Sequence, residues 1–126
     1  MQTLTVSPLV SRPATLEDCE KIAILLAAMY QEVGRAALNP QKAWAEIIDT
    51  VQNGACYVVE HQDLLVACIG MTYRPGGLFY SDAPWFIDKF FYVRPEYRPE
   101  SLDASAFTKL LGEVQNLVDS TGCPAS

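Results

Sequence analysis

The segment from Trp85 to Val93 constrains the fold of this chain more than any other. As an extended strand it is apolar or aromatic on both faces, and Asp88 and Lys89 are its exceptions. A strand with two apolar faces normally lies centrally in a sheet that helices cover. A short loop and an amphipathic helix follow this strand. The segment therefore predicts an α/β fold with this strand packed between helices.

The rest of the chain supplies three more strands and two more helices. Apolar residues at helical spacing follow a cap at Thr15 and a second cap at Asn39, and Gly34 and Gly54 are the expected helix ends. The expected order is strand, helix, helix, strand, strand, strand, helix, with strands at 7–13, 55–60, 64–73 and 85–93, a turn at 61–63 and a last helix at 101–119. We expect residues 1–126 to form one domain, a mixed sheet with helices on both faces.

Composition narrows the class of protein. Half of the residues are hydrophobic, which argues against disorder, and the net charge of −6 argues against a nucleic-acid partner. No apolar stretch reaches the ~20 residues of a membrane span, and Met1 to Val10 lacks the pattern of a signal peptide. The four cysteines show no metal-ligand spacing, and His61 is the single histidine. We therefore expect a cytoplasmic protein without a metal centre.

Two segments resemble a known family. The opening Ser11-Arg-Pro-Ala-Thr-Leu-Glu-Asp18 and the stretch Phe86-Ile-Asp-Lys-Phe-Phe-Tyr-Val-Arg-Pro-Glu-Tyr-Arg98 resemble the GCN5-related N-acetyltransferases, the GNAT superfamily. The resemblance covers roughly residues 10 to 122. It implies a truncated GNAT-like acyl-CoA N-acyltransferase fold, because the chain stops at Ser126, before the last strands of the family. It also implies transfer of an acetyl group from acetyl-CoA to an amine.

The resemblance further implies where coenzyme A binds. The family holds the pantetheine through backbone groups of this strand and the diphosphate through a loop of the form Arg/Gln-x-x-Gly-x-Gly/Ala. The matching residues here are Phe91 and Val93 in the strand, and Arg98, Ser101, Asp103 and Ala104 in the loop. Arg98 matches the pattern, whereas Ser101 and Asp103 replace glycines. The carboxylate of Asp103 would face a dianionic group.

Amine acetylation needs a base, and Asp88 is the acid inside the strand. Strict alternation puts Asp88 on one face with Phe86, Phe90 and Tyr92, where an apolar setting would raise its pKa. The alternative is that Asp88 pairs with a neighbouring basic residue. Glu60 and Glu96 are weaker candidates for the base. Tyr92 and Tyr80 are candidates for the acid.

A second class of function remains open. The replaced glycines and the early end of the chain favour a protein that keeps the fold, lacks activity and acts by binding another protein. In either case a sheet that ends at 85–93 has a long apolar edge, which invites aggregation. We expect a second copy, a protein partner or the first residues of the chain to cover that edge.

Overall fold

The computed structural model describes residues 9–34, 39–74, 84–98 and 105–122. The elements are β1 Val10–Pro13, α1 Cys19–Val33, α2 Pro40–Asn53, β2 Ala55–His61, β3 Leu64–Arg74, β4 Trp85–Val93 and α3 Ser105–Thr121. One-turn 3-10 helices at Leu16–Asp18 (η1) and Pro95–Tyr97 (η2) lie between them. This order confirms the order expected from the sequence.

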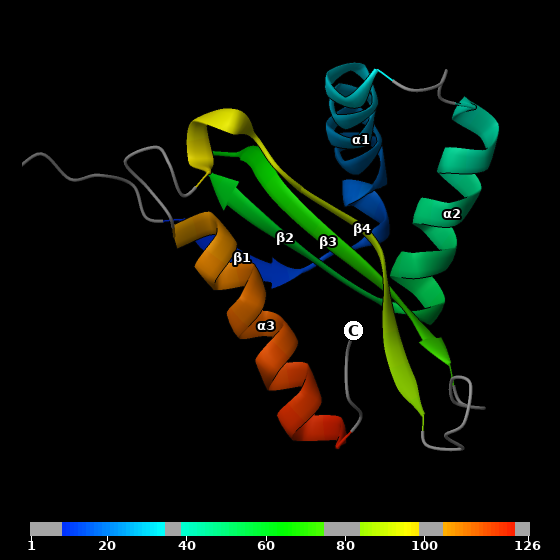
Figure 1. Ribbon diagram of the computed structural model, residues 1–126, viewed down its shortest axis with the longest axis vertical. Helices are drawn as coiled ribbons and strands as arrows, with labels where there is room; N and C mark the ends of the chain where they lie inside the picture. The colour runs from blue at the N-terminus through cyan, green and yellow to red at the C-terminus, as the bar shows by residue number, and fades with distance from the viewer. Residues whose placement is uncertain (1–8, 35–38, 75–83, 99–104, 123–126) are drawn as a thin grey trace, which may run out of the picture.

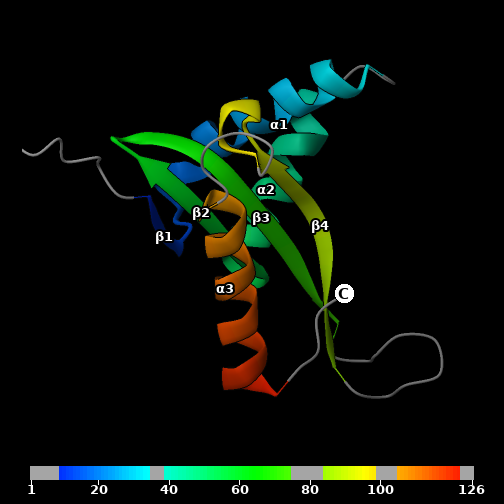
Figure 2. The same ribbon diagram turned by 60° about the vertical axis from the view of Figure 1, so that its left-hand side comes forward.

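The four strands form one sheet in the order β1-β2-β3-β4. Helices α1 and α2 cover one face and α3 covers the other, as Figure 1 and Figure 2 show from two directions. The three strand pairs are antiparallel, so the described strands include no parallel pair of the kind that a mixed sheet contains. Each face has its own buried cluster, one under α3 and one under α1 and α2. The α/β class with helices on both faces is confirmed.

The expected helix ends are present. The Asn39 side chain caps α2 by accepting a hydrogen bond from the Lys42 amide at 3.1 Å, and Pro40 occupies the first turn. Gly34 ends α1 in the left-handed conformation at φ 67°. No helix in the described ranges is long and apolar enough to cross a membrane.

Several boundaries differ from the expectation. The first strand begins at Val10, β3 extends to Arg74, and Thr15 caps η1, after which α1 begins at Cys19. The β2–β3 turn contains two residues rather than three, because His61 pairs with Leu64 and extends the ladder. Gln62 and Asp63 both have positive φ, the combination that matches the twist of a tight hairpin. The last helix is described from Ser105, while residues 101–104, where we expected its start, lie outside the described part.

A β-bulge in β4 corrects the expected alternation. Gly70 lies opposite Phe90, but the next residue of β3, Met71, lies opposite Asp88, so Lys89 is the extra residue. An extra residue shifts every following side chain to the other face of the sheet.

The bulge therefore divides the side chains of β4 between two faces. Phe86 is buried in the cluster under α3, whereas Phe90 and Tyr92 are buried in the cluster under α1 and α2. Asp88 pairs with Met71 of the α3-side cluster, so it shares a face with Phe86 only. The expectation that Asp88 shares a face with Phe90 and Tyr92 is wrong, because that expectation assumed an unbroken strand.

A charged network joins the start of the chain to β2. The guanidinium of Arg12 donates to both carboxylate oxygens of Asp18, at 2.7 and 2.8 Å, and to Glu60 at 2.8 Å. Asp18 is 4% exposed and also accepts from the Thr15 amide at 2.7 Å. The Arg12 hydrogen bonds lower the pKa of Asp18 to about 2. The network links η1 to strands β1 and β2. Because α1 continues directly from η1, the network also holds α1, which lines the candidate functional site.

Candidate functional site

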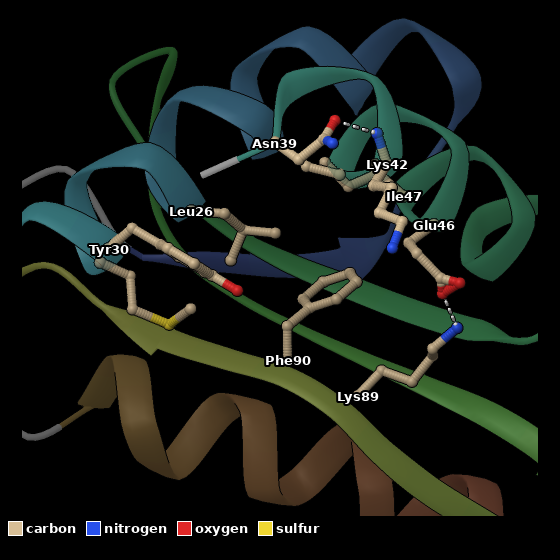
Figure 3. A pocket seen from close by; sticks show the side chains of 10 residues that line it. Leu26, Tyr30, Asn39, Lys42, Glu46, Ile47, Lys89 and Phe90 are labelled. Atoms are coloured by element: carbon tan, nitrogen blue, oxygen red, sulfur yellow. Dashed lines mark hydrogen bonds and ion pairs between the residues drawn. The ribbon is translucent and has the colours of Figure 1, made fainter. Parts of the chain in front are cut away.

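A pocket of about 380 Å³ lies between α1, α2 and β4 (Figure 3). Its volume falls in the range of sites for small ligands. The lining residues are Leu26, Met29, Tyr30, Asn39, Lys42, Ala43, Glu46, Ile47, Lys89 and Phe90. Two helices and one strand that are distant in sequence therefore build a single concave site.

The floor of the pocket is apolar. The ring of Phe90 lies directly on Gly70 of β3, because a Cβ at Gly70 would come within 2.2 Å of Phe90 Cζ. Glycine is thus the residue that lets the ring lie flat at this place. Leu26 of α1 and Ile47 of α2 are buried in the same cluster as this ring and line the pocket with it. These contacts fix the floor without any polar group.

The rim of the pocket is polar. The Lys89 ammonium forms an ion pair with the Glu46 carboxylate, which links the bulge of β4 to α2. The Lys42 side chain extends toward the ring of Phe90, and the Tyr30 hydroxyl approaches from α1 (Figure 3). Asn39 also lines the rim. Lysine ammonium groups and one neutralised carboxylate therefore surround an apolar floor.

Asp88 lies next to Lys89 but does not line this pocket. Its side chain is exposed, and burial of part of the carboxylate raises its pKa. Within the described residues, no ion pair or hydrogen bond involves Asp88, so the pairing that we considered as the alternative is not observed there. Glu46 is the carboxylate of the pocket. The sequence pattern missed it because an acid on the polar face of a helix looks like any solvated residue.

Arg98 has partners inside the protein. Its guanidinium forms an ion pair with Glu32 of α1: Nη1 lies 2.7 Å from Oε1, and Nη2 donates a hydrogen bond to Oε2 at 2.9 Å. The same carboxylate accepts from the Tyr92 hydroxyl at 2.8 Å, and Arg98 lies 5.4 Å above the Tyr92 ring. These bonds lower the pKa of Glu32, while burial and then the bond to Glu32 raise the pKa of Tyr92. Arg98, Tyr92 and Glu32 form one cluster at the end of β4.

The backbone at this end of β4 has a defined orientation. The Arg94 amide donates to the Val66 carbonyl of β3 at 2.8 Å. Because alternate residues of a strand turn their backbone groups to opposite sides, those of Val93 face away from β3. The Val93 carbonyl accepts from Arg98 Nε at 3.0 Å. Phe91 shares this orientation by alternation, while Ser101, Asp103 and Ala104 lie outside the described residues.

Comparison with known proteins identifies the arrangement at the level of fold. No family model matches the chain, and no curated protein matches it. Solved structures do. The aminoglycoside N-acetyltransferase AAC(6')-Iy, in complex with CoA, matches with a TM-score of 0.79 and 14% identity over 99% of this chain and 79% of that one.

Two further structures agree. A predicted acetyltransferase from Clostridium acetobutylicum, with acetyl-CoA, has a TM-score of 0.77 and 11% identity over 94% of this chain and 79% of that one. A possible acetyltransferase from Clostridium difficile 630 has a TM-score of 0.71 and 20% identity over 94% and 78%. The sheet, the helices on its two faces and their order are those of these proteins. The chain has the fold of the GNAT N-acetyltransferases.

Proposed function

We propose that the protein transfers an acetyl group from acetyl-CoA to a small amine in the cytoplasm. The observation that carries the proposal is the pocket beside Lys89 and Phe90. It opens against β4, the strand that the resemblance assigns to the pantetheine. An amine held there lies next to the edge at which the acyl group would be presented. AAC(6')-Iy, which shares this fold, is an aminoglycoside N-acetyltransferase, but it is only 14% identical to this chain.

We propose Asp88 as the base, which would take the proton of the acceptor through a water chain, because the bulge turns its side chain to the α3 face of the sheet, away from the pocket. Its carboxylate has a raised pKa and no ion-pair partner in the described ranges, which suits proton uptake. Glu46 is a poorer candidate because its carboxylate is already engaged in the ion pair with Lys89. We propose Tyr92 as the proton donor to the departing thiolate, since its raised pKa keeps the hydroxyl protonated.

If acetyl-CoA is the cosubstrate, groups at the end of β4 have to bind its pantetheine and its diphosphate. The backbone groups of Phe91 and Val93 would hold the pantetheine, and Arg98, with the amides of Ser101, Asp103 and Ala104, would hold the diphosphate. Arg98 instead engages Glu32 through both terminal nitrogens. Bound diphosphate would have to compete with this carboxylate for the guanidinium. Glu32 would therefore compete with the coenzyme diphosphate for the guanidinium of Arg98.

Calorimetric titration with acetyl-CoA tests this arrangement. We expect Arg98→Ala to weaken binding about tenfold or more, because charge-assisted hydrogen bonds to phosphate are lost. We expect Glu32→Gln to tighten binding, because an uncharged amide competes less well for the guanidinium. If both variants weaken binding equally, the pair of Arg98 with Glu32 stabilises the fold and Arg98 does not bind the diphosphate. If the wild type gives no heat at millimolar acetyl-CoA, the proposed reaction is wrong.

A catalytically inactive, protein-binding role is the second candidate. A specific observation favours it, an apolar groove on the outer side of α1 and α2. Ile24 and Trp44 line this groove and are 57% and 43% exposed. Exposed apolar surfaces of this kind occur at protein interfaces. The absence of any acetyl-CoA heat, together with normal folding, is the outcome expected of this second role.

The open edge of β4 leads to a prediction about assembly. In the described sheet β4 pairs on one side only, with β3, and an unpaired strand readily accepts another strand. We propose that a second copy, a protein partner or residues 1–8 cover it. The backbone amides of 86–93 that point away from β3 should then be protected from hydrogen exchange. Light scattering should show a dimer if a second copy covers the edge and a monomer if residues 1–8 cover it. Fast exchange of these amides in a clean monomer would contradict the proposal.

A further inference from the structure

The pocket lining differs in charge from the chain as a whole. The chain carries a net charge of −6, yet the pocket is lined by two lysines and one glutamate. Because Glu46 is already paired with Lys89, the charge of Lys42 remains uncompensated among the lining residues. A ligand that carries several positive charges would meet repulsion here, while an anionic group would be attracted.

Asn39 adds a second donor close to Lys42. Its side-chain oxygen is engaged by the Lys42 backbone amide at 3.1 Å. The bonding pattern fixes the side-chain orientation, so the amide nitrogen is the group left for a ligand. The Lys42 ammonium and the Asn39 amide thus both come from the first turn at the start of α2, and both are hydrogen-bond donors. A carboxylate, which only accepts hydrogen bonds, complements this pair.

The apolar floor of the pocket indicates which side chain the ligand carries. Phe90, Leu26, Ile47 and Met29 offer an aromatic and aliphatic surface, and about 380 Å³ is enough for a small molecule with one aromatic or aliphatic side chain. Building on the acetyl-transfer role proposed above, we infer that the acceptor is a small amine that carries an apolar side chain and a carboxylate, with the chemistry of a hydrophobic α-amino acid. Lys42 would bind its carboxylate, and the Phe90 floor would hold its side chain.

Direct binding tests this inference without acetyl-CoA. The probe is L-phenylalanine, monitored by calorimetry or by chemical-shift changes of the pocket residues. L-phenylalaninamide lacks the carboxylate, glycine lacks the apolar group and kanamycin is a polycation. We expect L-phenylalanine to bind about tenfold or more tightly than each of the three, as expected for loss of a charge-assisted hydrogen bond or of a buried ring.

A variant pair assigns the effect to the pocket. Lys42→Glu should weaken L-phenylalanine binding about tenfold or more and leave L-phenylalaninamide binding no weaker. Lys21→Glu, an equal charge reversal at an exposed position of α1 outside the lining, should change neither. Stronger binding of kanamycin or of the amide, or an unchanged Lys42→Glu protein, would overturn the inference.

The two proposals fail in different ways. If acetyl-CoA binds and kanamycin is acetylated in preference to L-phenylalanine, the inferred acceptor class is wrong while acetyl transfer stands. If acetyl-CoA does not bind but L-phenylalanine does, in a manner that depends on Lys42, then the acetyl-transfer role is wrong and the ligand class of the pocket stands.

Discussion

Asp88→Asn is expected to lower the turnover of acetyl transfer about 10²-fold or more, the usual weight of a general base. The amide keeps the shape of the side chain but cannot accept the proton. Because Asp88 is exposed and unpaired in the described ranges, the change should leave the melting temperature nearly unchanged. Affinity for acetyl-CoA should also stay constant, since the proposed coenzyme contacts lie at Phe91, Val93 and Arg98.

Glu46→Gln is the control for this result. It removes the other carboxylate near the bulge and breaks the ion pair with Lys89, so it alters the pocket without touching Asp88. We expect a smaller effect on turnover, expressed mainly in KM for the acceptor. Full turnover in a well-folded Asp88→Asn protein, combined with a 10²-fold loss in Glu46→Gln, would move the base from β4 to α2.

Asp18→Asn is expected to cost about 2 to 3 kcal/mol of unfolding free energy. Removing one partner of a buried ion pair costs about 3–5 kcal/mol, and we expect a cost at or below the lower end of this range because Arg12 keeps its bond to Glu60 and is partly exposed. Urea denaturation followed by circular dichroism measures the change. Glu17→Gln is the matched control, an exposed acid one residue earlier in η1, and should lie within about 0.5 kcal/mol of wild type.

The same carboxylate predicts a pH dependence. The folded state lowers the pKa of Asp18 from 3.8 to about 2, so the unfolded chain binds a proton at a higher pH than the folded protein does. The contribution of Asp18 to stability is therefore complete above pH 4 and is lost as the pH falls toward 2. Asp18→Asn should flatten the stability curve in this window. An unchanged slope would show that other acids control the acid unfolding.

The sequence alone determined most of the local structure. Caps and helical spacing act between residues at most four positions apart, so Asn39 and Gly34 mark their helix ends without help from the rest of the chain. The apolar run at 85–93 marked β4 with both of its boundaries. The resemblance carried by Phe86 to Arg98 pointed to the fold that the solved structures share.

The tertiary structure decided which of these residues meet. The bulge at Lys89 depends on how β4 pairs with β3 across Gly70. It places the side chains of Asp88 and Phe90 on opposite faces of the sheet, although the alternation of the sequence predicted the same face. The bond between Glu32 and Arg98 spans 66 positions, and the one between Lys89 and Glu46 spans 43. Such contacts form only after helices have packed on the sheet. No local propensity encodes them, and they decide the charge of the pocket and the partner of Arg98.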